Sequence, residues 1–176
     1  MARMEHPGSD RAAQVGMELK KRGWRLAVAE SCTGGLLGHR LTRIPGSSAY
    51  FLGGVIAYRN EIKARILNVR EETLAQFGAI SAEAAREMAE GVRHLFQADL
   101  ALAITGVAGP DPEEGKPVGE IYIALASPDG TWTRRITGGL DREENQALAV
   151  EAALELLEGM LRGSFPPEDS WGNEGS

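Results

Sequence analysis

Apolar positions along the first hundred residues alternate between two kinds of spacing. Consecutive apolar residues, as in 25–29 and 50–57, are typical of buried strands, whereas apolar residues that recur every three or four positions are typical of helices. Ser81 is placed to cap a helix that runs to about Phe96. The pattern therefore predicts helices at 11–22, 33–43, 61–68, 71–77 and 82–96, and strands at 25–29, 50–57 and 99–105.

Two predicted helices carry an apolar stripe along one face. In the helix after Ser81 the stripe consists of Ala85, Met88, Val92 and Leu95. The last helix begins at Asp141, with Glu144 three residues on, which is a capping-box pattern. Its stripe consists of Ala147, Val150, Leu154, Leu157 and Leu161. We expect this stripe to lie on the sheet or on another subunit, and we therefore expect a homo-oligomer.

The second half of the chain predicts an antiparallel pair of strands. Strands at 120–127 and 131–137 flank Pro128-Asp129-Gly130, a turn typical of hairpins. Together with the alternation before it, this predicts an α/β fold: a three-layer α/β/α sandwich with a mixed, mostly parallel sheet, in a single domain. We expect a flexible leader at 1–8, the domain at 9–162, and a disordered tail at 163–176, which is rich in Pro, Gly, Ser and acidic residues.

The charge balance narrows the range of partners. Nineteen Lys and Arg against 25 Asp and Glu give a formal net charge of −6, so there is no basic excess for binding nucleic acid or an anionic membrane. We find neither a signal-peptide pattern nor about 18 consecutive apolar residues, and expect a cytoplasmic protein. A single cysteine and three scattered histidines predict no disulfide, no metal site and no cofactor.

A small nucleophile lies where a predicted strand gives way to a helix, in AESCTGG at 29–35. The unpaired N–H groups in the first turn of a helix can bind a phosphate or an oxyanion, so Ser31 is a candidate nucleophile. The alternative is that Ser31 or Thr33 only caps the helix. Cys32 is a weaker candidate, because a lone cysteine in such a domain is more often a small buried residue.

Serine needs a base, and Lys63 is the best candidate. His6, His39 and His94 lie in the leader or in helices, which makes a Ser-His-Asp triad improbable. If Asn60 caps the helix that follows, Lys63 falls in its first turn, where the helix dipole and burial should both lower the pKa of the amine. The alternative is an exposed lysine that pairs with Glu61 or Asn60.

Tyr58 lies between the strand at 50–57 and Lys63. Its hydroxyl could hydrogen-bond the Ser31–Lys63 pair or pass a proton to a departing amine. The alternative is an interior ring with a satisfied hydroxyl.

A glycine-rich segment at 105–119 follows the third strand and carries Asp111, Glu113, Glu114 and Lys116. It is longer than a connection requires, which favours a binding loop; the alternative is a plain turn-rich connection. Ligands in open α/β sheets bind at the carboxyl ends of strands, where Ser31, Tyr58 and Thr105 would meet if their strands are parallel. Arg142 lies at the start of the last helix and could hold a phosphate or carboxylate, or could pair with Asp141 or Glu143.

Several blocks in this order closely resemble the CinA C-terminal domain family. They are AESCTGG at 29–35, PGSSAYFLGGVIAYRNEIKARILNV at 45–69, ETLAQFGAIS at 72–81, ITGVAGP at 104–110, KPVGEIYIA at 116–124 and GLDR at 139–142. The resemblance covers most of residues 10–162. Stand-alone members of that family are nicotinamide-nucleotide amidases.

The resemblance implies a Ser-Lys hydrolase that converts nicotinamide mononucleotide to nicotinate mononucleotide and ammonia, in pyridine nucleotide salvage. It implies Ser31 as nucleophile, with Lys63 and Tyr58 as the other catalytic residues. The residues expected to bind substrate are Glu30, Thr33, Gly34, Gly35, Asn60, Thr105, Gly106, Gly109 and Arg142. Two alternatives stay open: a non-catalytic, nucleotide-binding or regulatory module associated with competence or DNA damage, and hydrolysis of another amide such as free nicotinamide.

Overall fold

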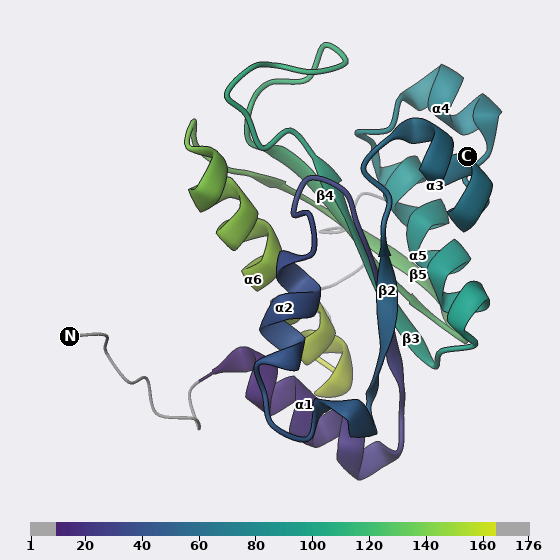
Figure 1. The fold of residues 1–176 in the computed structure, drawn as a ribbon, viewed down its shortest axis with the longest axis vertical. Coiled ribbons are helices and arrows are strands. Elements are labelled where there is room, and N and C mark those ends of the chain that lie inside the picture. The colour runs from purple at the N-terminus through teal and green to yellow at the C-terminus, as the bar shows by residue number, and fades with distance from the viewer. Residues whose placement is uncertain (1–9, 165–176) are drawn as a thin grey trace.

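Five strands form one sheet between two layers of helices in the computed structural model, which describes residues 10–164 (Figure 1). The strands are β1 (Leu26–Glu30), β2 (Phe51–Ile56), β3 (Leu100–Gly106), β4 (Glu120–Ser127) and β5 (Gly130–Thr137). The helices are α1 (Arg11–Arg22), α2 (Leu36–Thr42), α3 (Asn60–Leu67), α4 (Glu71–Phe77), α5 (Ala82–Phe96) and α6 (Arg142–Leu161), with a 3-10 turn η1 (Ser47–Ala49).

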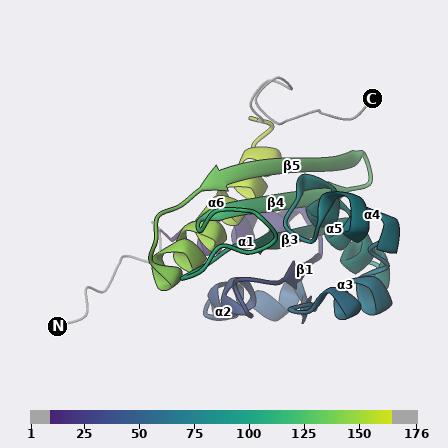
Figure 2. The ribbon, with the colours of Figure 1, turned by 90° about the horizontal axis from the view of Figure 1, so that it is seen from above.

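The sheet has the order β2-β1-β3-β4-β5. Its first three strands are parallel, and β4 and β5 add two antiparallel pairings, the last of them closed by the predicted hairpin turn. Figure 2 shows the helices on both faces, with α1, α2 and α6 on one and α3, α4 and α5 on the other. The three-layer, mixed sandwich with a parallel core is therefore confirmed. No helix within residues 10–164 is long and apolar enough to cross a membrane.

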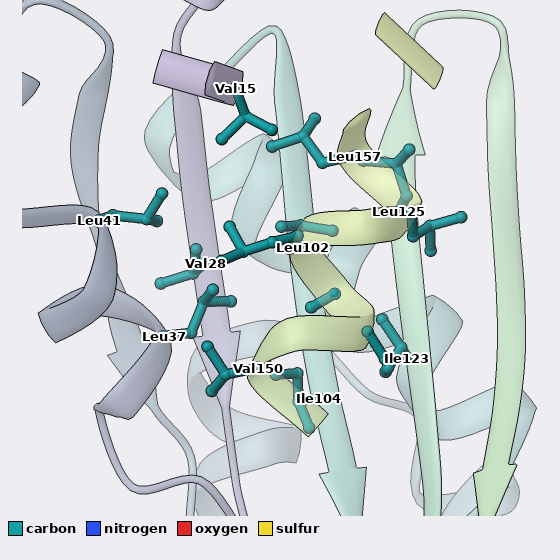
Figure 3. Close-up of a cluster of buried hydrophobic side chains, with 14 of the residues drawn as sticks. Val15, Val28, Leu37, Leu41, Leu102, Ile104, Ile123, Leu125, Val150 and Leu157 are labelled. Carbon is teal, nitrogen blue, oxygen red and sulfur yellow. The ribbon is translucent and has the colours of Figure 1, made fainter. Parts of the chain in front are cut away.

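The three central strands, β1, β3 and β4, alternate large and small apolar residues, which sorts them onto two different faces. Large side chains such as Val28, Leu102 and Ile123 point toward α1, α2 and α6 (Figure 3). The alanines between them, such as Ala27 and Ala101, face α5. Because side chains in a strand alternate between faces, this pattern gives α5 a flat surface on which it can pack closely.

The stripe on α6 packs within the chain. Val150, Leu154, Leu157 and Leu161 are buried in the same cluster as residues of α1 and of the sheet. Ala147, expected in the stripe, is exposed, and Ala149 is buried. The stripe therefore gives no support for self-association, and a homo-oligomer stays a prediction. On α5 the stripe is confirmed except at Leu95, which is 52% exposed at the end of the helix.

Several predicted boundaries were wrong for local reasons. Helix α2 begins at Leu36 and not at residue 33, because Gly34 and Gly35 adopt left-handed backbone conformations with φ of 55° and 105°. The N-cap of α3 is Arg59 and not Asn60, which is the first helical residue.

The C-terminal cap of α6 lies inside the segment predicted to be a tail. Gly163 donates to the Met160 carbonyl and Ser164 to the Gly159 carbonyl, which is a Schellman motif. The tail expected at 163–176 is thus ordered at its first two residues. The rest of it, and the leader expected at 1–8, lie outside the described residues.

Tyr50 is a buried residue that should tolerate the loss of its hydroxyl. Its side chain is 3% exposed and packs against Gly16 of α1, and within residues 10–164 its hydroxyl has no hydrogen-bond partner. We expect Tyr50→Phe to keep or raise the free energy of unfolding in urea, by up to about 1 kcal/mol, because an unsatisfied buried hydroxyl costs stability.

Tyr122→Phe is the matched control, since its hydroxyl donates to Glu120 at 2.6 Å. We expect that variant to lose about 1 kcal/mol. A loss of the same size in Tyr50→Phe would contradict the prediction.

Candidate active site

A cavity of about 130 Å³ lies at the carboxyl ends of β1 and β3, beside the segment that follows β2. Its lining includes residues expected from the sequence: Ser31, Tyr58, Asn60, Lys63, Thr105, Gly106, Gly109 and Arg142. It also includes Asp111 and Glu113 of the predicted binding loop, and residues for which no binding role was predicted: Cys32, Ala79, Ile80, Val107 and Ala108. The parallel strands thus bring Ser31, Tyr58 and Thr105 together, as their place at strand ends predicts.

Ser31 and Lys63 are in direct contact inside this cavity. The Lys63 Nζ lies 3.0 Å from the Ser31 Oγ and 3.1 Å from the Tyr58 carbonyl oxygen, to which it donates. Ser31 is 7% exposed and Lys63 only 2%. At this separation a neutral amine can equally accept the serine proton, which is the geometry that a general base requires.

Burial lowers the pKa of Lys63 below the ordinary value of a lysine, since a charged amine loses its hydration there. The carboxylates of Glu114 and Glu113 and the Cys32 side chain act in the opposite direction, but the net shift is downward. The predicted direction of the shift is thus found in the structure, although Lys63 is the fourth residue of α3 and not the third. The alternative, an exposed lysine that pairs with Glu61 or Asn60, is wrong. Lys63 is buried and its amine contacts Ser31 and Tyr58, while Glu61 pairs with Arg59 at 3.2 Å.

Residues 31–35 form the turn that carries Ser31, which we call the nucleophile turn. The Ser31 N–H donates to the Ile104 carbonyl of β3 at 3.0 Å, and the Gly34 N–H donates to the Ser31 carbonyl at 3.1 Å. These bonds attach the turn to the central strand and close it on itself.

Glu30 caps α2 from within the core. One carboxylate oxygen accepts from the Thr33 hydroxyl at 2.7 Å and the Leu37 N–H at 2.8 Å, and the other accepts from the Gly38 N–H at 3.0 Å. The reading of Ser31 or Thr33 as the helix cap is therefore wrong. Glu30, Thr33, Gly34 and Gly35 do not line the cavity, because the two polar side chains are used in this cap and the glycines shape the turn.

Cys32 lines the cavity but is a poor nucleophile. Burial raises the pKa of its thiol to about 12, so the thiolate is scarce at neutral pH. Neither His39 nor His94 lines the cavity, which leaves Lys63 as the base nearest to Ser31.

Tyr58 and Arg142 meet at the mouth of the cavity. The Arg142 guanidinium donates to the Tyr58 hydroxyl at 3.0 Å and also to the Gly109 carbonyl. Tyr58 is 57% exposed, so the reading as an interior ring is wrong. Within the described chain Arg142 forms no ion pair, either with Asp141 or with Glu143, and its charge faces the cavity.

The predicted binding loop, 107–119, which we call the glycine-rich loop, is held by Glu114 from within the loop and by Asn145, for which the sequence predicted no role. Glu114 accepts from the Ile80 N–H at 3.1 Å, and Asn145 donates to the Ala108 carbonyl at 3.0 Å. Asn145 is 1% exposed and also bonds both the N–H and the carbonyl of Gly139. The sequence offers one signal for the role of Asn145: it is a polar residue on the face of α6 that is otherwise apolar and buried.

Thr105 lines the cavity and also links two of the segments around it. Its hydroxyl donates to the Ala79 carbonyl at 2.8 Å, which attaches the segment between α4 and α5 to the end of β3. Among residues 10–164, no group of three His, Cys, Asp or Glu side chains is arranged to hold a metal ion.

Comparison with known proteins gives a consistent result. Residues 9–161 match the CinA C-terminal domain. A CinA-like protein from Frankia casuarinae is 52% identical over 145 residues, which are 82% of this chain and 34% of that protein. One from Geobacter sulfurreducens is 46% identical over 139 residues, 78% of this chain and 34% of that protein. The chain therefore spans about a third of the length of the curated relatives that it matches.

Solved structures match over nearly their whole length. The competence-damaged protein (CinA) superfamily protein from Klebsiella pneumoniae superposes with a TM-score of 0.84 at 38% identity, covering 87% of this chain and 96% of that one. The competence/damage inducible protein CihA from Agrobacterium tumefaciens gives a TM-score of 0.84 at 35% identity, covering 92% and 99%.

Proposed function

This chain belongs to the CinA C-terminal domain family, and we propose that it is an amidohydrolase that converts nicotinamide mononucleotide to nicotinate mononucleotide and ammonia. The observation that carries the proposal is the 3.0 Å contact between the Ser31 hydroxyl and the buried Lys63 amine in a cavity. A hydroxyl beside an amine of lowered pKa is an activated nucleophile. The reaction would serve pyridine nucleotide salvage in the cytoplasm.

In the first half of the reaction, neutral Lys63 accepts the Ser31 proton while the Ser31 oxygen attacks the carboxamide carbon. The carbon becomes tetrahedral and its oxygen gains a negative charge. The carbon–nitrogen bond then breaks, and the nitrogen leaves as ammonia with the proton that Lys63 holds. Ser31 is left as an ester of nicotinate mononucleotide.

In the second half, Lys63 accepts a proton from water, and the resulting hydroxide adds to the ester carbon. The bond to the Ser31 oxygen breaks, and that oxygen recovers its proton from Lys63. Nicotinate mononucleotide leaves, and both side chains return to their starting states. The Tyr58 hydroxyl accepts from the Arg142 guanidinium at 3.0 Å, and the Tyr58 carbonyl accepts from the Lys63 amine. Tyr58 therefore orients Lys63 and also lines the entrance.

The Cys32 N–H is the best-placed donor for the negatively charged oxygen. Cys32 follows the nucleophile and lines the cavity, and within residues 10–164 no oxygen accepts a hydrogen bond from its N–H, which interacts only with the sulfur of its own side chain. Such backbone donors beside a nucleophile commonly stabilise the oxyanion of acyl transfer. The N–H groups of Leu37 and Gly38 are excluded from this role, because Glu30 already accepts from them.

Charges around the cavity support a substrate with both a cationic ring and an anionic group. The carboxylates of Asp111 and Glu113 line the cavity and favour a positively charged pyridinium ring over a neutral one. Arg142 lies at the mouth, where its guanidinium can hold a phosphate once it gives up bonds to Tyr58 or Gly109.

Substrates that lack one of these features test the proposal. We expect the wild-type protein to release ammonia from nicotinamide mononucleotide. With nicotinamide riboside, which lacks the phosphate, kcat/KM should fall about 100-fold, because charge-assisted hydrogen bonds contribute about 2–3 kcal/mol. Free nicotinamide lacks the ribose as well and should be poorer still. Ammonia release is measured by a coupled assay.

The Arg142→Met variant is the control for phosphate recognition. It should lower kcat/KM for the mononucleotide and leave the value for nicotinamide riboside nearly unchanged. Binding of the mononucleotide in calorimetry with no ammonia release would instead favour the non-catalytic module. Equal rates for all three amides would contradict the substrate assignment.

A further inference from the structure

The first turns of α6 contact three segments of the cavity. Arg142 bonds the Tyr58 hydroxyl and the Gly109 carbonyl, Asn145 bonds the Ala108 carbonyl, and the Gln146 amide donates to the Cys32 carbonyl at 2.9 Å. In Figure 1 the start of α6 lies at the same end of the sheet as the loop between β3 and β4. Of these three side chains only Arg142 lines the cavity.

The bond from Gln146 acts on the nucleophile turn. The peptide before Cys32 is already fixed, because the Ser31 carbonyl accepts from the Gly34 N–H at 3.1 Å. Gln146 fixes the peptide after Cys32, through the Cys32 carbonyl. The Cys32 N–H belongs to the first of these planar peptides, and the Gly34 bond restrains that peptide only from within the turn. The Gln146 bond ties the second peptide to α6, so the two peptides cannot rotate together about the Cys32 dihedral angles.

We propose that Gln146 is a positioning residue that orients the Cys32 N–H toward the oxyanion formed at Ser31. This inference rests on the proposed amidohydrolase function. Gln146 is half-buried, does not line the cavity and reaches across 114 positions of the chain to a single backbone oxygen. Its effect therefore falls on the transition state, where the oxyanion exists, and not on the bound substrate.

The size of the effect follows from the role of the donor. Losing an oxyanion donor outright costs about 10²–10³ in kcat, and misdirecting one costs part of that. We expect Gln146→Met to lower kcat about 10- to 50-fold with KM within about threefold of wild type. Methionine matches the length and helix propensity of glutamine but cannot donate a hydrogen bond.

Glu144→Ala is the matched control in the same part of α6. Glu144 is exposed, and within residues 10–164 its side chain makes no hydrogen bond or ion pair to the cavity segments. Only its backbone N–H is used, in the cap made by Asp141. That variant should keep kcat and KM near the wild-type values. Thermal unfolding of all three proteins confirms that they are folded under assay conditions.

A fluorophosphonate probe separates this inference from the choice of substrate. The Ser31 oxygen displaces fluoride from phosphorus, its proton passes to Lys63, and the phosphoryl oxygen occupies the oxyanion position. Mass spectrometry of the peptide containing Ser31 gives the rate of labelling. We expect Gln146→Met to be labelled about 10-fold more slowly than wild type and than Glu144→Ala.

The outcomes are distinguishable. Slow labelling of Gln146→Met in a protein that does not hydrolyse the mononucleotide would retain the positioning role and reject the proposed substrate. A labelling rate or kcat within twofold of wild type would overturn the inference. A loss confined to KM would also overturn it, and so would failure of the probe to label Ser31 in the wild type.

Discussion

The Ser31→Ala variant is expected to release ammonia from nicotinamide mononucleotide at least about 10⁴-fold more slowly than wild type, because the atom that forms the acyl bond is absent. Among residues 10–164, Ser31 supplies the only hydroxyl that hydrogen-bonds the Lys63 amine. Binding should persist, since Arg142 and the glycine-rich loop are unchanged. Turnover by the ammonia assay and the Kd by calorimetry measure these two effects separately.

Ser48→Ala is the control, because Ser48 is an exposed serine far from the cavity lining. It should retain wild-type turnover. Activity in Ser31→Ala within about tenfold of wild type would remove Ser31 from the mechanism. The raised pKa of Cys32, about 12, argues that the neighbouring thiol cannot take over at neutral pH.

The Lys63→Met variant is the second large loss that we expect, again about 10⁴-fold in kcat. Methionine has nearly the length of lysine but offers no base to the Ser31 proton. The fold should survive, because the change also removes the cost of burying an amine. We expect the free energy of unfolding to stay within about 2 kcal/mol of wild type at neutral pH.

The pH dependence gives Lys63 a signature that a structural role would lack. Burial lowers its pKa in the folded protein, so the unfolded chain binds the extra proton more readily. Wild-type stability relative to Lys63→Met should therefore rise as pH increases from the folded pKa toward the ordinary lysine value, and turnover should rise with pH through the folded pKa. The control Lys20→Met, at an exposed position on α1, keeps Lys63. Its stability relative to wild type should not depend on pH in this range, and its turnover should rise with pH as in wild type. If wild-type turnover and the stability difference from Lys63→Met did not change with pH in this range, a neutral Lys63 base would be contradicted.

The fold could be predicted because burying one face of a helix or strand makes apolar residues recur at a regular spacing along the chain. The strand and helix patterns predicted α1, α4, α5 and β4 at the observed bounds. The errors lie where a side chain acts on backbone several residues away. The start of α2 was placed too early because Gly34 and Gly35 adopt left-handed conformations before it, and nothing in the spacing of Glu30 indicates that its carboxylate accepts from the Leu37 and Gly38 N–H groups.

The contact between Ser31 and Lys63 could be predicted because the carboxyl ends of parallel strands lie at the same edge of a sheet. Ser31 and Lys63 each follow a parallel strand, and chemistry singled them out as nucleophile and base. Asn145 and Gln146 could not be found in this way. Their bonds to the Ala108 and Cys32 carbonyls join segments that are distant in the chain, and such bonds produce no regular spacing of residue types that a sequence could reveal.

The contacts made by the start of α6 limit how far the chain could be shortened from its C-terminal end without releasing the segments around the cavity. Both reactive side chains lie within the first 63 positions, yet the segments around them are held by Asn145 and Gln146, which come after the β4–β5 hairpin. A fragment that ended at the hairpin would contain the dyad without its frame. Under the proposed function, we therefore expect the smallest active fragment to extend from β1 into α6.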